Sequence, residues 1–150
     1  MSTILLIEDD PFVVEWIKRL VDRAYGRKVN VEVISSERHF LVRMPTLSSV
    51  TAIIVDLMLP WEDGVPIPAA DKEYLEPRGD HLVAGTRIIQ DLLGNSNLQH
   101  IPTLFYTVND KPANWDHQQA PPNLTYMRKD EPDDRFMAWV RDALVVSKVL

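Results

Sequence analysis

The sequence predicts a three-layer α/β fold in which helices cover both faces of a doubly wound sheet of five parallel strands. Short apolar runs alternate along the chain with longer stretches in which apolar residues recur at helical spacing. This alternation is typical of a parallel sheet, because a helix must carry the chain back to the edge where the next strand starts. Residues 52–55 are apolar at every position, as expected of a strand covered on both faces. With 150 residues, 45% of them hydrophobic, the chain can enclose one sizeable core.

Each expected strand is a short apolar or β-branched run that ends at a polar residue. The strands lie at residues 3–7, 29–34, 51–55, 103–106 and 124–127. The second alternates apolar and polar residues, which is typical of a strand near the edge of a sheet. The third and fourth are apolar along their length and are expected near its centre.

About five helices are expected, at residues 11–25, 37–42, 86–93, 114–119 and 133–148. Pro11 suits the first position of the first helix, and Gly26 suits its end. Ser36 is the expected N-cap of the second helix, which Pro45 ends. The fourth helix is expected to be short and distorted, because prolines lie on both sides of it.

Composition excludes several classes of function. A net charge of -6 gives no basic surface for nucleic acid or for an anionic membrane. The absence of cysteine excludes disulfides, a thiolate nucleophile and a zinc–thiolate site. No signal peptide and no membrane-spanning stretch is recognised. A cytoplasmic protein is expected, with neither nucleic acid nor membrane as a partner.

Residues 61–84 break the regular alternation. This stretch contains three prolines and many charged residues, with little periodicity. Connections between a strand and the next helix usually have about 2–6 residues. We therefore expect an insertion at 61–84 that forms an ordered flap or a partner surface. Residues 1–150 are expected to form a single domain with no separate output domain.

Side chains that can hold a metal and a phosphoryl group follow the ends of several strands. Glu8, Asp9 and Asp56 are carboxylates, Thr107 brings a hydroxyl group, and Lys129 brings an ammonium. The carboxyl ends of parallel strands meet at one edge, where open sheets bind their ligands. Carboxylates packed together repel unless a cation lies among them, and Mg²⁺ favours oxygen ligands of this kind.

With a metal in place, the chemistry of these groups suggests a division of roles. The carboxylate of Asp56 can attack phosphorus and form an aspartyl phosphate. The cation and the ammonium of Lys129 can then stabilise charge on the transferring group. The hydroxyl group of Thr107 can bond to a phosphate oxygen.

Four segments together resemble the receiver domain of two-component response regulators. They are ILLIEDDP at residues 4–11, IVDLMLP at 54–60, FYT at 105–107 and YMRK at 126–129. The resemblance covers the whole chain except the insertion at 61–84. It implies a flavodoxin-like, CheY-like fold with strand order 2-1-3-4-5.

The resemblance also implies a phosphorylation-dependent signalling switch rather than an enzyme. Asp56 would accept a phosphoryl group from a phosphohistidine of a sensor histidine kinase or histidine phosphotransfer protein. The domain would catalyse only its own phosphorylation and dephosphorylation. The implied Mg²⁺ ligands are Glu8, Asp9 and Asp56, with the backbone carbonyl of Met58.

The other implied roles concern the readout of the phosphorylated state. Lys129 would contact the phosphoryl oxygens, while Thr107 and Tyr126 would rearrange as a switch. Output would be contact with an unknown downstream protein, or formation of a homodimer.

Besides the insertion at 61–84, the sequence departs from the family pattern at two positions close to the predicted site, Asp130 and Val108. Gly85, after the insertion, matches the glycine that normally precedes the third helix. Asp130 follows Lys129 where the family has a proline in a cis peptide bond, which leaves the placement of Lys129 open. Val108 replaces a residue that is usually small.

Two alternative functions remain open on sequence grounds. A pseudo-receiver would keep the fold as a binding module that works without phosphorylation. An aspartate-nucleophile phosphohydrolase would need a second carboxylate two positions after Asp56, where the chain has Met58. The phosphohydrolase is therefore the weaker alternative.

Overall fold

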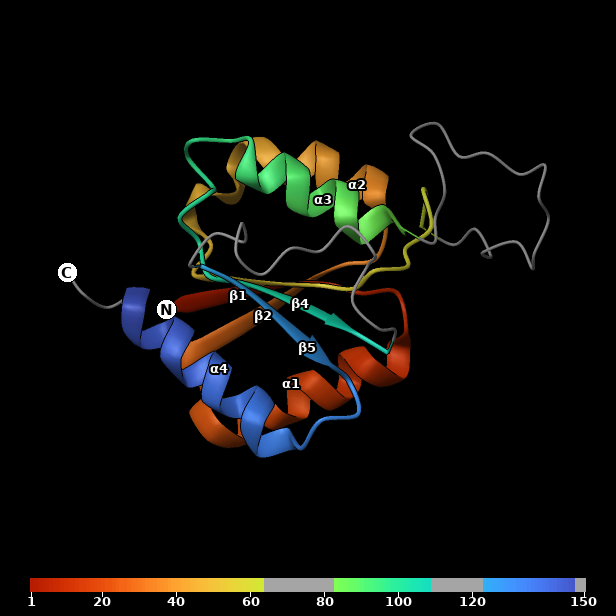
Figure 1. The fold of residues 1–150 in the computed structure, drawn as a ribbon. Coiled ribbons are helices and arrows are strands. Elements are labelled where there is room, and N and C mark those ends of the chain that lie inside the picture. The colour runs from red at the N-terminus through yellow and green to blue at the C-terminus, as the bar shows by residue number, and fades with distance from the viewer. Residues whose placement is uncertain (64–82, 109–122, 148–150) are drawn as a thin grey trace.

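The five strands form one parallel sheet in the predicted order β2-β1-β3-β4-β5 (Figure 1). The computed structural model describes residues 1–63, 83–108 and 123–147. The strands are β1 (Ser2–Ile7), β2 (Val29–Ile34), β3 (Ala52–Val55), β4 (Thr103–Thr107) and β5 (Leu124–Arg128). Because β2 and β3 pair with opposite sides of β1, the strand order reverses at β1.

In the described part of the chain, helices cover both faces of the sheet, which confirms the three-layer architecture (Figure 1). On one face lie α1 (Pro11–Tyr25) and α4 (Asp133–Ser147), and on the other α2 (Glu37–Arg43) and α3 (Ala84–Leu93). No helix in the described part of the chain is long and apolar enough to cross a membrane. The helix expected at 114–119 lies outside the described residues, as do residues 64–82 of the insertion.

The core is built by the alternation of side chains along the buried strands. In β1, Leu5 and Ile7 pack toward α2 and α3, while Ile4 and Leu6 pack toward α1 and α4. All four are almost completely buried. Burial of an aliphatic side chain of this size contributes about 1.5–3 kcal/mol, so an apolar residue is favoured at every position of such a strand.

Helix α1 begins and ends as its sequence predicts. The side chain of Asp10 accepts a hydrogen bond from the backbone N–H of Phe12 at 2.9 Å, and Pro11 occupies the first turn. At the other end, Gly26 adopts a φ of 57°, a left-handed conformation that favours glycine. These two ends fix where the chain leaves β1 and where it enters β2.

Helix α2 begins after Ser36, which caps it as expected, and ends at Arg43. The chain then continues as a short 3-10 helix, η2 (Met44–Ser49), with Pro45 in its first turn. Proline is tolerated in a first turn because its missing N–H has no partner there. Pro45 therefore starts a new element instead of only ending α2.

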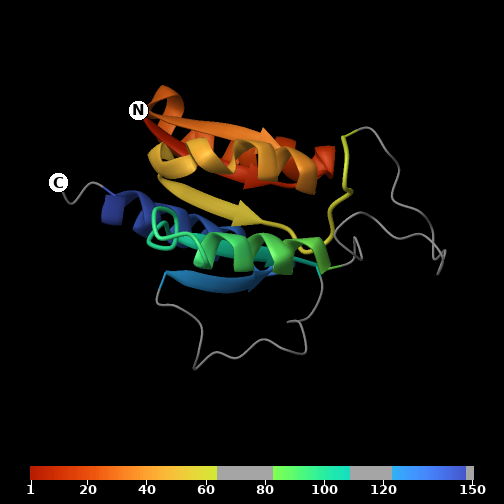
Figure 2. The ribbon, with the colours of Figure 1, turned by 90° about the horizontal axis from the view of Figure 1, so that it is seen from above.

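All five strands run in the same direction, and Figure 2 shows their arrowheads pointing toward one edge of the molecule. The N-terminus and the end of α4 lie at the opposite edge (Figure 2). Polar residues that follow β1, β3, β4 and β5 are therefore brought to one edge of the sheet.

Candidate functional site

Three carboxylates come together beyond the carboxyl ends of β1 and β3. Glu8, Asp9 and Asp56 each present an oxygen atom, and these atoms all lie within 4.8 Å of one another. The backbone N–H of Glu8 donates to Ile34 at 2.9 Å, and that of Asp56 donates to Ile7 at 3.0 Å. Because these bonds continue the pairing of the sheet, the backbone positions of Glu8 and Asp56 are fixed by the strands.

Lys129 lies in the same group of side chains, at the end of β5. Its ammonium is 2.6 Å from Oε2 of Glu8 and 3.4 Å from Oδ1 of Asp56. Its backbone N–H donates to the carbonyl of Thr107 at 2.9 Å. The bond to Asp130 is trans, since the described chain has no cis peptide bond. Lys129 thus reaches the predicted site without the proline typical of the family.

Burial governs the electrostatics of the site. It raises the pKa of Glu8, and the charge of Asp56 raises it further, although Lys129 works in the opposite direction. Burial likewise raises the pKa of Asp56 and of Asp9. The two carboxylates hold the pKa of Lys129 above its usual value despite burial. The ionised form of these carboxylates is therefore unfavourable in free energy, and a bound cation would offset that cost.

The geometry of the carboxylates fits a magnesium ion. Oxygen ligands lie about 2.0–2.1 Å from Mg²⁺, so opposite ligands are about 4.2 Å apart. The three carboxylate oxygens lie within 4.8 Å of one another, so modest side-chain movements would bring them to a common ion. When all four groups are ionised, three carboxylates and one ammonium carry a formal charge of −2, which one divalent cation would neutralise.

Gly85 brings the start of α3 directly against the end of β3. A Cβ atom at this position would lie 2.1 Å from the backbone oxygen of Asp56 and 2.8 Å from Cα of Leu57. The N–H of Gly85 donates to the carbonyl of Leu57 at 2.8 Å. No side chain fits in this space, which gives a physical reason for glycine at the position that matches the family.

The chain after β3 crosses over to the start of α2, which the sequence did not predict. The carbonyls of Pro60 and Trp61 accept hydrogen bonds from the first two N–H groups of α2, both at 2.9 Å. Ser36 accepts the next two, through its side chain and its carbonyl. The segment 57–63 thereby supplies hydrogen-bond acceptors for the first N–H groups of a helix that lies about twenty residues earlier in the chain.

A buried ion pair, also missed by the sequence reasoning, joins α2 to α3. Glu37, at the start of α2, is completely buried and accepts two hydrogen bonds from Arg87, at 2.7 and 2.9 Å. Its sequence position predicts only a favourable charge in the first turn of a helix. No sequence signal identifies Arg87 as its partner, because the two residues meet only when both helices pack on the same face.

The predicted readout residues lie on one face of the sheet. Thr107 ends β4 and is fully buried. Tyr126 is half-buried in β5 and contacts Phe105, with 6.2 Å between the ring centroids. Phe105 pairs with Tyr126 across the two strands, so alternation places Thr107 and Tyr126 on the same face. Val108, by contrast, is 63% exposed.

Met58 lies two residues beyond Asp56, and its side chain packs against the core next to α2 and α3. The role predicted for its backbone carbonyl as a metal ligand stays a prediction.

No protein-family model matches this chain by sequence, and no curated protein is found as a sequence relative. Solved structures do match it along almost its whole length. A sensor protein from Polaromonas sp. JS666 has a TM-score of 0.67 and 16% identity, covering 97% of this chain and 98% of that one. A signal receiver domain of a two-component histidine kinase from Clostridium thermocellum has a TM-score of 0.67 and 21% identity, covering 95% and 97%.

A third similar structure is the signal receiver domain of a signal transduction histidine kinase from Syntrophus aciditrophicus. Its TM-score is 0.66 at 19% identity, with 100% of this chain and 95% of that chain covered. At such identities the likeness concerns the fold, and the strand order 2-1-3-4-5 agrees with it. The chain therefore has the flavodoxin-like, CheY-like fold of two-component signal receiver domains.

Proposed function

We propose that this protein is a phosphorylation-dependent signalling switch in which Asp56 accepts a phosphoryl group. One observation carries the proposal: the ammonium of Lys129 lies within 3.4 Å of Asp56 and 2.6 Å of Glu8, at the carboxyl edge of a receiver fold. A buried nucleophile, a second carboxylate and a fixed cation are the groups that phosphoryl transfer to a carboxylate requires.

The transfer itself needs few groups from the protein. An oxygen of Asp56 attacks phosphorus as the bond from phosphorus to the imidazole nitrogen of the donor breaks, and that nitrogen keeps the electron pair. Lys129 offsets charge on the oxygens of the transferring group, which costs little reorganisation because the ammonium is already in place. Only 10% of the Asp56 side chain is exposed, which restricts how closely a phosphoryl donor can approach it.

Mg²⁺ bound by Glu8, Asp9 and Asp56 would supply further positive charge to the phosphoryl oxygens. The proposal includes this ion because three carboxylates have their oxygens within 4.8 Å and have raised pKa values. Met58 would add its backbone carbonyl.

The readout would begin at Thr107, whose carbonyl bonds to the backbone of Lys129. An aspartyl phosphate adds about −1.5 to −2 charges and new acceptor oxygens beside Thr107 and Lys129. A shift of Thr107 leaves space on the face of the sheet that it shares with Tyr126. The proposed partners are a histidine kinase or histidine phosphotransfer protein as donor and a downstream protein as target, with self-association as another route.

A pseudo-receiver is the second candidate function, and the short contact between Lys129 and Glu8 favours it. This ion pair partly neutralises the site without any metal. A chain held in that state would keep the receiver fold as a binding module and would resist phosphorylation.

Intact-mass spectrometry after incubation with Mg²⁺ and acetyl phosphate separates the two functions. The switch predicts the gain of one phosphoryl group, lost in Asp56→Asn and retained in Asp10→Asn. Asp10 is a matched control because it adjoins the site, and asparagine can also cap a helix. An unmodified mass with acetyl phosphate and with several phosphohistidine donors would sink the switch and leave the pseudo-receiver.

A further inference from the structure

A pocket lies at the edge of the sheet opposite the three carboxylates. It encloses ≈ 500 Å³ where β1 and β2 begin, between the end of α1 and the last turns of α4. The six residues of β1 separate it from Glu8, a distance of about 20 Å at 3.3 Å per residue. Pockets of about 300–1,000 Å³ are the size that small organic ligands occupy.

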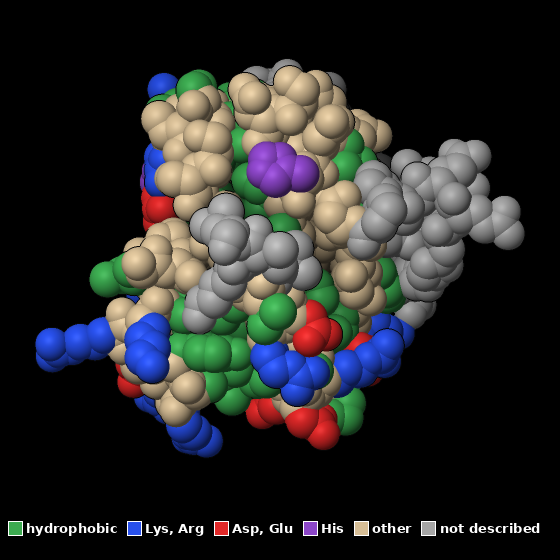
Figure 3. Space-filling model, turned by 90° about the vertical axis from the view of Figure 1, so that its left-hand side faces the viewer, with side chains coloured by type: hydrophobic (Ala, Val, Ile, Leu, Met, Phe, Trp, Pro, Cys, Tyr) green, Lys and Arg blue, Asp and Glu red, His purple; other side chains and the backbone are tan. Residues whose placement is uncertain are grey.

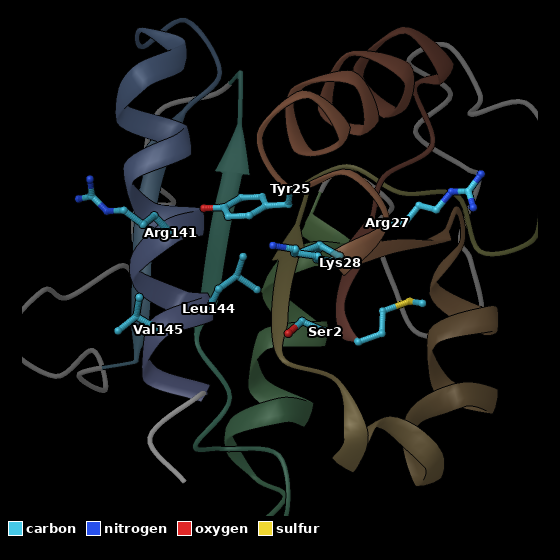
Figure 4. A pocket seen from close by; sticks show the side chains of 9 residues that line it. Ser2, Tyr25, Arg27, Lys28, Arg141, Leu144 and Val145 are labelled. Atoms are coloured by element: carbon cyan, nitrogen blue, oxygen red, sulfur yellow. The ribbon is translucent and has the colours of Figure 1, made fainter.

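Three hydrogen-bond donors line one side of the pocket, and we call them the donor side: Ser2, Tyr25 and Lys28. Figure 4 shows the hydroxyl group of Tyr25 and the ammonium of Lys28 directed toward α4, across the gap. Lys28 forms no ion pair within the described part of the chain. An unpaired ammonium between two hydroxyl groups is a site for an anionic group.

The apolar residues of the lining are Val29, at the start of β2, and Leu144 and Val145 on α4; we call the two on α4 the apolar wall. Leu144 points from α4 into the gap that the donor side faces (Figure 4). Val145 is 58% exposed although it is apolar. An apolar wall beside a cationic group suits a ligand that has both an anionic head and an apolar body.

The charge around the pocket is opposite to that of the molecule as a whole. Among the residues that the structure describes, its lining contains Arg27, Lys28 and Arg141 and no acidic residue, in a chain whose net charge is -6. Figure 3 shows this face of the molecule: in its lower half, Lys and Arg side chains lie on both sides of hydrophobic ones, with Asp and Glu side chains beside and below them. Arg141 is partly neutralised by Asp142 at 3.3 Å. Arg27 is directed away from the gap in Figure 4, so Lys28 is the cation that faces α4.

Arg27 and Lys28 also follow the carboxyl end of α1, where basic residues stabilise a helix. That role explains their charge. It does not explain why Lys28 points away from α1 toward α4, or why an apolar wall faces it (Figure 4).

We propose that this pocket binds a small organic anion. The anionic head lies at the donor side, and the apolar body lies along the apolar wall. The carboxylates at the other edge repel such a ligand, so the basic edge is its preferred place on the molecule. The proposal is independent of phosphorylation, because the two sites lie at opposite ends of β1.

Two fluorescent probes that differ only in their charged group test the proposal. The anion 1-anilinonaphthalene-8-sulfonate and the neutral N-phenyl-1-naphthylamine share one aromatic body. We expect the anion to bind at a single site at least fivefold more tightly than the neutral probe. We also expect its affinity to fall as salt is added. Equal affinity for the two probes would overturn the proposal.

Variants then locate the binding. Lys28→Gln should lower the affinity for the anionic probe at least threefold and change the affinity for the neutral probe by less than twofold. Lys18→Gln makes the same change of charge on an exposed residue of α1 outside the pocket. It should not change the affinity for either probe. Val145 is the exposed residue of the apolar wall. Val145→Glu should lower the affinity for the anionic probe and Val145→Lys should not, although both variants remove the same valine.

If Lys28→Gln and Val145→Glu bind the anionic probe as the unaltered chain does, the pocket is not an anion site. Asp56→Asn should bind both probes normally. That result separates the pocket from the proposed phosphoryl site, whatever the outcome of the acetyl phosphate experiment.

Discussion

Gly85 lies so close to Asp56 that a Cβ atom on the glycine would be 2.1 Å from the backbone oxygen of the aspartate. The contact is between backbone atoms, so neither partner can rotate a side chain to make room. The start of α3 therefore acts as a rigid support for the strand end that carries the proposed nucleophile.

Gly85→Ala should destabilise the protein by about 1–3 kcal/mol, because the added methyl group forces α3 away from β3. Urea unfolding followed by circular dichroism measures this change. Gly94→Ala is the control at the other end of α3, where a Cβ atom would lie 3.3 Å from the carbonyl of Gln90. A cost for Gly85→Ala no larger than for Gly94→Ala would contradict the close packing.

Lys129→Met should slow phosphorylation of Asp56 by acetyl phosphate about 100-fold, the usual scale for loss of one charge-stabilising donor. Mg²⁺ binding should persist or tighten, because the variant removes a cation 2.6 Å from Glu8. Time-resolved intact mass measures the first effect, and isothermal titration calorimetry measures the second. If phosphorylation and Mg²⁺ binding were lost together, the variant would have a damaged fold and not only a missing charge. Lys18→Met is the control that removes a lysine away from the site.

The stability of the metal-free protein should fall as pH rises. Burial raises the pKa of Glu8 from 4.5 to about 8, and raises those of Asp9 and Asp56. Between those two pH values the native state holds a proton that the unfolded chain has lost, so each step upward in pH favours unfolding. Excess Mg²⁺ should reduce this dependence, because the ion replaces the proton.

Urea unfolding at about pH 5.5 and at pH 8, each with and without MgCl₂, checks this expectation. A metal-free protein that is as stable at pH 8 as at pH 5.5 would show that the carboxylates are better solvated than the structure indicates. Glu8→Gln should flatten the pH dependence, since it removes the carboxyl group whose pKa is raised to about 8.

Glu37→Ala should destabilise the protein by about 3–5 kcal/mol, the usual cost of breaking a buried ion pair by removing one of its members. Glu37 is completely buried, and its carboxylate holds Arg87 of α3. Glu62→Ala is the matched control, because Glu62 pairs with Arg38 on the surface, where an ion pair contributes at most about 1 kcal/mol. Thermal unfolding of the two variants gives the comparison.

Much of the fold follows from local sequence. Each strand is an apolar run with a polar stop, and α1 has Asp10 and Pro11 at one end and Gly26 at the other. Patterns of this kind depend only on neighbouring residues, so strands, helices and their order could be predicted. Since parallel strands end at one edge, Glu8, Asp9, Asp56 and Lys129 could also be predicted to meet.

Only the tertiary structure decided which of these groups touch. The ammonium of Lys129 lies nearer to Glu8 than to Asp56, although sequence reasoning paired it with the phosphoryl group on Asp56. β1 and β5 are separated by two strands, so the contact depends on the twist of the sheet and the length of the lysine side chain.

The start of the insertion likewise has features that the sequence predicted and contacts that only the tertiary structure revealed. The prolines and charges of residues 61–84 predicted an irregular segment, but not that Pro60 and Trp61 would complete the first turn of α2. The pairing of Glu37 with Arg87 likewise joins residues fifty positions apart. By itself the sequence determined which residues reach the edge of the sheet, because strand direction follows from the order of elements. Contacts between groups that are distant in the sequence depend on how the layers pack, and this packing cannot be predicted from neighbouring residues.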